Sequence, residues 1–358
     1  MKLGLGLYRS MLTDENFRFA RQSGCTHIIA HLVDYYNSTN GVHDTDEKRN
    51  YGIAVADEDV WSYEYLLKLK EKINSFGLEL YAIENFSPAD WFDILLDGPK
   101  KMEQIEKIKT IIRRVGKVGI PVIGYNFSIA GVWGHIRGAH ARGGAVSVGY
   151  SHTNGPFHTP IKKGDVWNMS YDPSIKEGFL EKINHEQLWE RLEFFLKAVI
   201  PVAEEAGVRL AAHPDDPPMP IVRDTPRLVY QPHMYRRLLD VIKSKCNSLE
   251  YCMGTIQEMS KGNIYDSIEE HSNLGEIAYV HFRNVKGKVP DYHEVFIDEG
   301  DIDMVKAMKI FIKNGFDGVF IPDHTPIMEC NAPWHAGMAH ALGYINGIIK
   351  TLKSKEME

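Results

Sequence analysis

The chain has 358 residues, of which 44% are hydrophobic, and a formal charge of −7. This length can bury one large core, and α/β barrels reach it without splitting, so we expect a single domain over residues 1–358. With 41 basic against 48 acidic residues, the chain lacks the cationic excess that binding to a phosphate backbone requires. Composition therefore argues against a nucleic-acid partner.

Targeting and redox signals point to a cytoplasmic protein. The apolar stretch before Arg9 is too short for a signal peptide, and no apolar run is as long as a membrane span. Four cysteines in a chain of this length do not make a disulfide framework. We therefore expect a cytoplasmic location, no membrane partner, and reduced thiols that are available to a metal.

Short runs of β-branched and aliphatic residues alternate with segments of helical periodicity, which is typical of parallel strands joined by helices. Strands are expected at 3–7, 27–32, 78–84, 121–125, 208–213, 249–253, 277–282 and 318–322. Helices are expected at 15–23, 61–76, 102–118, 187–206, 232–245, 303–314 and 335–352. Glycines stand where several of these helices should end, namely at Gly77, Gly119, Gly207 and Gly315. This alternation predicts a (β/α)₈ TIM barrel.

Two segments, 33–58 and 128–183, interrupt the alternation and are expected to be insertions on strand-to-helix loops. The second follows the fourth strand, and it carries Gly143, Gly144 and the histidines His135, His140, His152 and His158. Long irregular loops in compact domains tend to be lids or binding loops. We therefore predict that 128–183 is a lid that covers or flanks the mouth of the barrel.

Four successive predicted strands end on side chains that bind metals: His213, Cys252, His281 and Asp323. In a (β/α)₈ barrel the carboxyl ends of the strands meet on one face, where the active site lies. Two imidazoles, a thiolate and a carboxylate can enclose a divalent cation and still leave room for substrate oxygens. Each residue alone is more often a satisfied core group or an inert cysteine. Four at equivalent positions favour a metal site.

Other strand ends carry further polar side chains. Glu84 and Asn85 follow the third strand, and Tyr125 and Asn126 follow the fourth; capping of the next helix or loop is the competing interpretation for each pair. Arg283 lies two residues beyond a proposed ligand, so strand alternation points it into the same mouth, where its planar fork suits a carboxylate. We expect Arg283, Asn126 and Glu84 to bind substrate.

The acidic pair Asp215 and Asp216 has a different expectation. Two prolines follow it directly, at Pro217 and Pro218. Prolines and Asx turns fix the backbone more often than they bind ligands, so this pair is expected to stiffen a loop.

The motifs around these positions resemble those of the mannonate dehydratase family, and the resemblance is strongest from 208 to 324. They are His213 to Pro218, Tyr125 to Phe127, Tyr251 to Gly254, Val280 to Arg283, His293-Glu294, Gly300 to Met304 and Pro322 to His324. The resemblance implies a Mn²⁺-dependent lyase of hexuronate catabolism that converts D-mannonate into 2-keto-3-deoxy-D-gluconate and water. It also implies the same four metal ligands and places His293 among the substrate-binding residues. Softness of the thiolate alone would suggest Zn²⁺, and Fe²⁺, Co²⁺ and Mg²⁺ are also compatible with the donor set.

The sequence departs from the family in one segment near the reacting face. Family members have a Pro-Gly-Tyr segment whose tyrosine is assigned an acid/base role, and here the segment is Pro333-Trp334-His335. Thr325 also replaces a family glycine. The proposed ligands are unaffected, but the substrate could be another aldonate or a related sugar acid.

Dehydration of a 2,3-dihydroxy acid removes the proton at C2 and expels the hydroxyl at C3, so two proton-transfer groups are needed. His324, next to a proposed ligand, is the first candidate; His335 is the second by position, and Tyr125 is a weaker one. The sequence does not assign acid and base among them.

Two further functions stay open at this point. One is a metal-dependent sugar isomerase or epimerase, and the other is a sugar-acid-binding barrel without chemistry. A small sugar acid is the expected partner in every case, and a homo-oligomer is compatible with the sequence.

Overall fold

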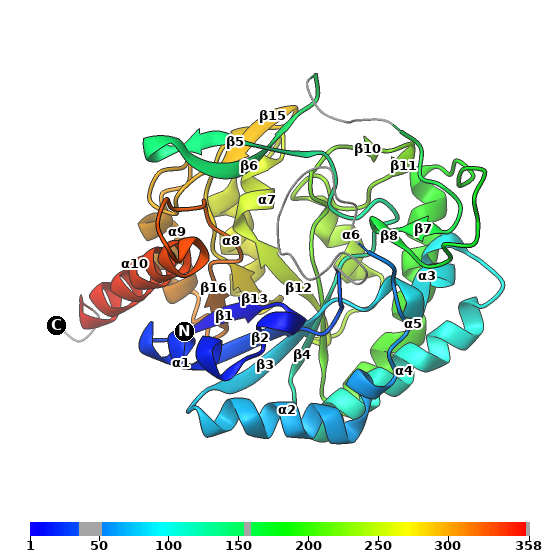
Figure 1. The fold of residues 1–358 in the computed structure, drawn as a ribbon, viewed down its shortest axis with the longest axis horizontal. Coiled ribbons are helices and arrows are strands. Elements are labelled where there is room, and N and C mark those ends of the chain that lie inside the picture. The colour runs from blue at the N-terminus through cyan, green and yellow to red at the C-terminus, as the bar shows by residue number, and fades with distance from the viewer. Residues whose placement is uncertain (36–51, 154–158, 356–358) are drawn as a thin grey trace.

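Eight parallel strands close into a barrel in the computed structural model, which describes residues 1–35, 52–153 and 159–355 (Figure 1). Around the barrel the order is β1-β16-β13-β12-β9-β4-β3-β2. The bounds are β1 (Lys2–Leu7), β2 (His27–His31), β3 (Glu79–Glu84), β4 (Val122–Tyr125), β9 (Arg209–Ala212), β12 (Asn247–Cys252), β13 (Ile277–His281) and β16 (Val319–Ile321). The predicted TIM barrel is confirmed, and each predicted strand overlaps one of these eight.

Helices cover the outside of the barrel. Within the described residues they are α1 (Asp14–Gln22), α2 (Tyr63–Ser75), α3 (Pro88–Leu96), α4 (Lys101–Val118), α5 (His185–Ala206), α6 (Met234–Asp240), α7 (Met253–Glu258), α8 (Ile264–Asn273), α9 (Met304–Lys313) and α10 (Pro333–Lys355). Short 3₁₀ turns are η1 (Arg9–Met11), η2 (Asp59–Trp61) and η3 (Arg142–Gly144). All seven predicted helices are present, although α6 is shorter than predicted. The helices α3, α7 and α8 were not among those predicted.

Glycine ends several helices as predicted. Gly119 and Gly207 follow α4 and α5 in the left-handed region, with φ of 77° and 67°. A side chain with a Cβ would strain that conformation, so glycine lets the chain turn directly into the next strand.

The barrel interior is apolar from the amino-terminal ends of its strands to their middle. Alternate residues of the strands point inward there, and they include Ile29, Ala82, Val122, Ala211, Ala278, Val319 and Ile321. Toward the carboxyl ends of the strands this packing gives way to buried polar groups, among them Glu84 and Glu250. The polar groups of the barrel therefore gather at the end where a (β/α)₈ site is expected.

The insertion after β4 forms part of a second, antiparallel sheet. Its strands β5 (His135–Ala141) and β6 (Ala145–Ser151) join β15 (Asp291–Glu294) and β14 (Val285–Lys288) in the order β14-β15-β6-β5. Since β14 and β15 follow β13 in the chain, this sheet lies beyond the carboxyl end of the barrel; β5, β6 and β15 appear together at the top of Figure 1.

Smaller strand pairs complete the described structure: β7 (Asp165–Val166) with β8 (Met169–Ser170), and β10 (Ile221–Val222) with β11 (Thr225–Pro226). The two predicted insertions meet where the Ala54 N–H donates to the Ser170 carbonyl, 2.8 Å away. Much of the first insertion, and His158 in the second, lie outside the described residues.

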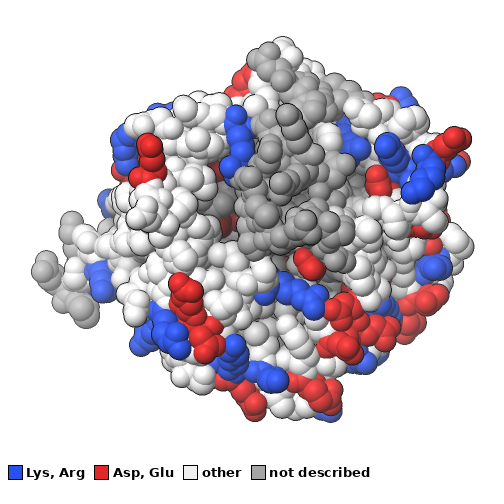
Figure 2. All heavy atoms as spheres, in the orientation of Figure 1, with Lys and Arg blue, Asp and Glu red and all other residues white. Residues whose placement is uncertain are grey.

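Among the described residues, no helix combines the length and the apolar character that crossing a membrane requires. Figure 2 shows basic and acidic side chains interspersed over the visible face of the molecule. The described residues on that face form no continuous basic surface of the kind a nucleic acid would need.

Candidate metal centre and active site

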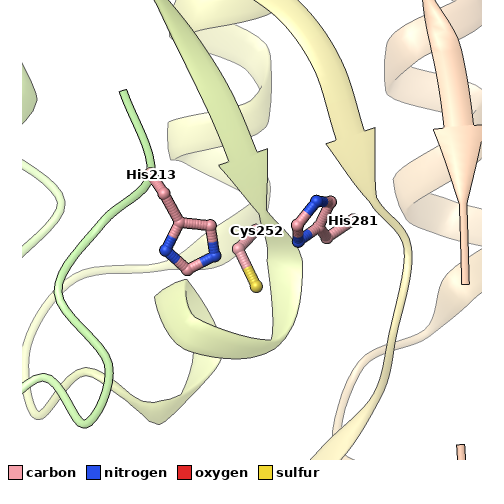
Figure 3. Close-up of side chains that lie close together, drawn as sticks. All are labelled: His213, Cys252 and His281. Atoms are coloured by element: carbon pink, nitrogen blue, oxygen red, sulfur yellow. The ribbon is translucent and has the colours of Figure 1, made fainter. Parts of the chain in front are cut away.

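Three of the four proposed ligands converge at the ends of neighbouring strands. His213 follows β9 directly, and Cys252 and His281 are the last residues of β12 and β13. Cys252 and His281 are paired in register. One ligand atom from each of the three residues lies within 4.8 Å of the others. Figure 3 shows the sulfur of Cys252 between the two imidazole rings.

The backbone around His213 leaves one of its ring nitrogens available to bind a metal. Its own N–H donates to the Tyr125 carbonyl, 2.8 Å away, which ties this loop to β4. The ring Nδ1 lies 2.6 Å from the carbonyl of Pro214. A carbonyl only accepts, so Nδ1 carries a proton, and Nε2 is the ring nitrogen that is left to bind a metal.

Asp323, the fourth proposed ligand, lies at the edge of the cluster and is not part of the three-residue group within 4.8 Å. It follows β16 with a φ of 63°, in the left-handed region that aspartate tolerates better than most residues. Its Oδ2 lies 3.4 Å from Nδ1 of His281 and 3.3 Å from Nε of Arg283. The carboxylate therefore faces Nδ1 of the His281 ring.

The charge state of Cys252 favours metal binding. Burial alone would raise the pKa of its thiol, but the positive charge of Arg283 and the neighbouring imidazoles of His213 and His281 hold that pKa well below its usual range. The Thr255 hydroxyl also donates to Sγ at 3.1 Å. A thiolate is the form of cysteine that ligates metals.

The donor set fits a divalent cation. Both ring nitrogens of His281 are buried, and neither makes a hydrogen bond with any described residue. Buried polar atoms without partners are costly, and a bound cation would give one of these nitrogens its missing partner. Two imidazoles, a thiolate and a carboxylate are together a ligand set for a transition-metal ion.

Arg283 is surrounded by carboxylate side chains. Its Nη1 contacts Glu258 and Glu294 at 2.9 and 3.1 Å, and its Nη2 contacts Asp216 at 2.7 Å and Thr255 at 3.0 Å. The guanidinium group is buried, and both of its terminal nitrogens make hydrogen bonds with protein side chains. The sequence suggested that the guanidinium group of Arg283 binds a substrate carboxylate. In the structure its partners are side chains of the protein itself.

Asp215 and Asp216 were both expected to stiffen a loop, and only Asp215 has the contacts of such a residue. Asp216 joins the Arg283 cluster and also accepts from the Tyr292 hydroxyl at 2.8 Å. Through Tyr292, the antiparallel sheet β14-β15-β6-β5 contacts the site. Asp215 accepts from the backbone N–H groups of Leu228 and Val229 at 2.7 and 2.9 Å, as a loop-stiffening residue does.

His324 borders this cluster and is the more exposed part of it. Its Nδ1 lies 2.7 Å from Glu294 and its Nε2 lies 3.2 Å from Asp323, while 40% of its side chain is exposed. Burial would lower the pKa of His324, but the charges of Asp323 and Glu294 raise it to about 9. The ring therefore holds a proton at neutral pH and presents it at the surface of the site.

Comparisons with known proteins agree with this geometry. The D-mannonate dehydratase (UxuA) family model matches residues 50–358. This chain belongs to the mannonate dehydratase family. A mannonate dehydratase of Streptococcus pneumoniae is 32% identical over 317 residues, which cover 83% of this chain and 86% of the relative.

Solved structures give the same result for the fold. The mannonate dehydratase of Streptococcus suis serotype 2 superposes with a TM-score of 0.78 and 25% identity, covering 100% of this chain and 95% of that one. A D-tagatose 3-epimerase-like protein superposes with a TM-score of 0.57 and 14% identity, covering 99% of each chain. The second likeness shows a shared barrel alone.

Two residues considered for catalysis lie away from the cluster of His213, Cys252 and His281. Tyr125 is fully buried, and its ring packs edge-on against Phe195 in the helix layer, because strand alternation turns Gly124 inward and Tyr125 outward. His335 lies at the start of α10, with Nε2 3.1 Å from Oδ1 of Asn16 in α1. The structure thus places both residues in packing between elements.

Two residues considered for substrate binding also have other partners. Asn126 donates to the Pro214 carbonyl at 3.2 Å and accepts from the Trp167 indole at 3.3 Å, so it anchors the loop that carries His213. His293 stacks on His140 at 5.3 Å. On β15 the neighbouring side chains of Tyr292 and Glu294 point inward, and alternation therefore turns His293 to the other face of that sheet.

Glu84 has the burial that was expected of a site residue, and it meets a partner that the sequence did not predict. Glu250 faces the same interior, and both carboxylates lie close to His281. Glu250 stands two residues before Cys252 on one strand, so alternation counted back from the cysteine would have found it. Burial and the Glu84 charge raise the pKa of Glu250 well above its usual range.

His31 and His135 were not predicted, for a different reason. His31 ends β2, with Nε2 3.7 Å from Glu84, and His135 from the insertion lies 3.4 Å from Asp216. His31 stands on the second strand, whereas the run of metal-binding strand ends starts at the fifth. His135 was one of several insertion histidines, and sequence alone gave no means of choosing among them.

Proposed function

We propose that this protein is a metal-dependent hydro-lyase that converts D-mannonate into 2-keto-3-deoxy-D-gluconate and water. The observation that carries the proposal is the convergence of His213, Cys252 and His281 at neighbouring strand ends in a chain of the mannonate dehydratase family. The set includes a thiolate, which the carboxylate-rich metal sites of sugar isomerases and epimerases do not favour.

The four residues proposed to hold the cation are His213, Cys252, His281 and Asp323. A divalent cation bound there would supply Lewis acidity to the carboxylate and adjacent hydroxyl of the substrate. We propose Mn²⁺ as the physiological ion. The thiolate would also accept Zn²⁺, Fe²⁺ or Co²⁺.

His324 is proposed as the acid of the reaction. Its ring holds a proton at neutral pH because Asp323 and Glu294 face its two nitrogens. When the C2–H bond breaks, its electron pair forms the C2–C3 double bond and the C3–O bond breaks. The hydroxyl leaves as water with the proton from His324. The resulting enol becomes the 2-keto product by losing the proton of its C2 hydroxyl and taking up a proton at C3.

His135 is proposed as the group that takes the C2 proton. It comes from the insertion, and its Nε2 lies 3.4 Å both from Oδ1 of Asp216 and from the Tyr292 hydroxyl. Neither Tyr125 nor His335 has a comparable position, since both pack between elements. In this proposal the insertion 128–183 contributes a reacting group and also limits the access of water.

The test is turnover of D-mannonate by protein reconstituted with Mn²⁺. Formation of a 2-keto-3-deoxy acid is expected, and in D₂O one deuterium should appear at C3 of the product. D-Gluconate, the C2 epimer, serves as the stereochemical control, and other aldonates test the departure at His335. An epimerase would give a new aldonate without water loss, and binding without any product would indicate a barrel that lacks chemistry; either result would overturn the proposal.

A further inference from the structure

The two ring nitrogens of His281 face different groups. Nδ1 lies 3.4 Å from Oδ2 of Asp323, on the side of the proposed cation. Nε2 lies 3.2 Å from Oε1 of Glu250 and 3.4 Å from Oε2 of Glu84. One edge of the ring therefore faces the metal ligands, and the opposite edge faces a pair of carboxylates that the proposed reaction does not use.

This carboxylate pair is deeply buried. Glu250 is 1% exposed and Glu84 is 6% exposed, and Oε2 of Glu250 makes no hydrogen bond with any described residue. The Tyr279 hydroxyl donates to Oε2 of Glu84 at 3.2 Å. Two carboxylates facing each other in a barrel interior are costly to bury, so a role for them is expected.

The surrounding backbone is fitted to the pair. Gly124 on β4 faces the same interior, and a Cβ there would lie 2.3 Å from Oε2 of Glu250 and 2.3 Å from the Tyr279 hydroxyl. Any larger residue at Gly124 would push Glu250 away from His281. This glycine is thus required by close approach and not by its backbone angles.

We propose that Glu84 and Glu250 are positioning residues that orient His281 as a metal ligand, an inference that rests on the proposed metal site. The negative charge that faces Nε2 orients the ring and keeps its proton on that nitrogen, which leaves the lone pair on Nδ1 for the cation. Imidazole ligands of metals are commonly held in this way by a carboxylate on the opposite nitrogen. Glu84 thus acts through His281, whereas the sequence had suggested contact with substrate.

The experiment measures metal affinity and a spectroscopic signature, both of which are independent of turnover. Glu250→Gln, Glu84→Gln and the double variant are prepared as apoproteins, and Mn²⁺ affinity is measured by competition with a chelator. We expect about tenfold weaker binding for each single variant and up to about 100-fold for the double variant, at an unchanged stoichiometry. In the Co²⁺-loaded protein, the d–d bands should shift while the thiolate charge-transfer band of Cys252 persists.

Glu250→Asp and Glu84→Asp keep the charge but shorten the reach, so they should also weaken Mn²⁺ binding. They keep the test open if a glutamine variant does not fold. Asp90→Asn is the matched control, because Asp90 is a fully buried carboxylate that pairs with Lys107 at 2.8 Å in the helix layer. Its Mn²⁺ affinity should equal that of the unmodified protein.

Two results would overturn the inference. Wild-type Mn²⁺ affinity and an unchanged Co²⁺ spectrum in the double variant would show that the pair does not position His281. A second bound equivalent of metal that Glu250→Gln removes would instead make the pair a cation site. Failure of the unmodified protein to bind any metal would sink the proposed function itself, so the two failures are distinguishable.

Discussion

Cys252 and His281 stand side by side at the ends of two adjacent parallel strands, paired in register on β12 and β13. Because side chains at paired positions of a parallel ladder point to the same face, this register brings the thiolate and the imidazole together before any loop is considered. Half of the proposed ligand set is therefore a property of the barrel itself. His213 is the first residue beyond β9, and Asp323 is the second beyond β16.

The first prediction tests Cys252 as a ligand. Cys252→Ser replaces the thiolate by a hydroxyl that stays protonated near neutral pH, so Mn²⁺ affinity should fall by more than the roughly 10- to 100-fold loss typical of removing an outer-sphere partner. Activity should disappear in parallel. The measurement is metal content after dialysis beside turnover of D-mannonate. Full metal occupancy without activity would contradict the ligand assignment.

The second prediction concerns Arg283, the single guanidinium group among Asp216, Glu258 and Glu294. Arg283→Ala leaves these buried carboxylates without their counter-charge, and breaking a buried pair in this way costs about 3–5 kcal/mol of unfolding free energy. Arg283→Lys keeps the charge but loses the planar fork, so a smaller loss is expected. Urea unfolding of the apoproteins gives both values. An Arg283→Ala protein as stable as the unmodified one would show that the carboxylates are neutral in the fold.

The third prediction uses acid stability at a site remote from the proposed metal. Burial would raise the pKa of Glu276, but its hydrogen bonds with His271 and Arg236 hold that pKa below its usual range. The folded state therefore favours the carboxylate. This stability is fully present above the unfolded pKa of about 4.3 and is lost as the pH falls through the lower folded value. Glu276→Gln should remove about 1.5–3 kcal/mol near neutral pH and flatten the acid limb of the unfolding curve. If Glu276→Gln lowered the unfolding free energy equally at every pH, the prediction would be wrong.

Sequence patterns predicted the barrel well because its strands are short apolar runs separated by helices with clear glycine stops, such as Gly119 and Gly207. The short helix α7 was missed, since its six residues follow β12 without a linker and show no helical period long enough to recognise. Hydrophobic periodicity thus predicts strands and helices that are separated by clear stop signals. It fails where a short helix follows a strand directly, as α7 follows β12.

Side-chain direction limited what could be predicted of the site. Tyr125 and His293 lie next to residues that do face the site, and in each case strand alternation turns them to the opposite face. The partners of Arg283 could not be predicted either, because Asp216 comes from a loop, Glu258 from the end of α7 and Glu294 from the strand β15. Those contacts depend on tertiary packing that no single segment encodes.

The last prediction compares two histidines as proton-transfer groups. The Nε2–H of His335 donates to Oδ1 of Asn16 at 3.1 Å, and the ring meets the Phe19 ring edge-on at 4.8 Å. His335→Ala should therefore cost about 0.5–1.5 kcal/mol of unfolding free energy and leave turnover close to normal. His135 reaches the Asp216 cluster, and His135→Ala should lower kcat by about 10²–10⁴-fold at full Mn²⁺ content, which is the usual contribution of a general acid or base. The two variants are compared for turnover, metal content and thermal unfolding. His140→Ala is the matched control within the insertion, because His140 stacks on His293 away from the site. A His335→Ala enzyme that lost turnover with its metal intact, while His135→Ala stayed active, would return the acid/base role to the position where the family has its tyrosine.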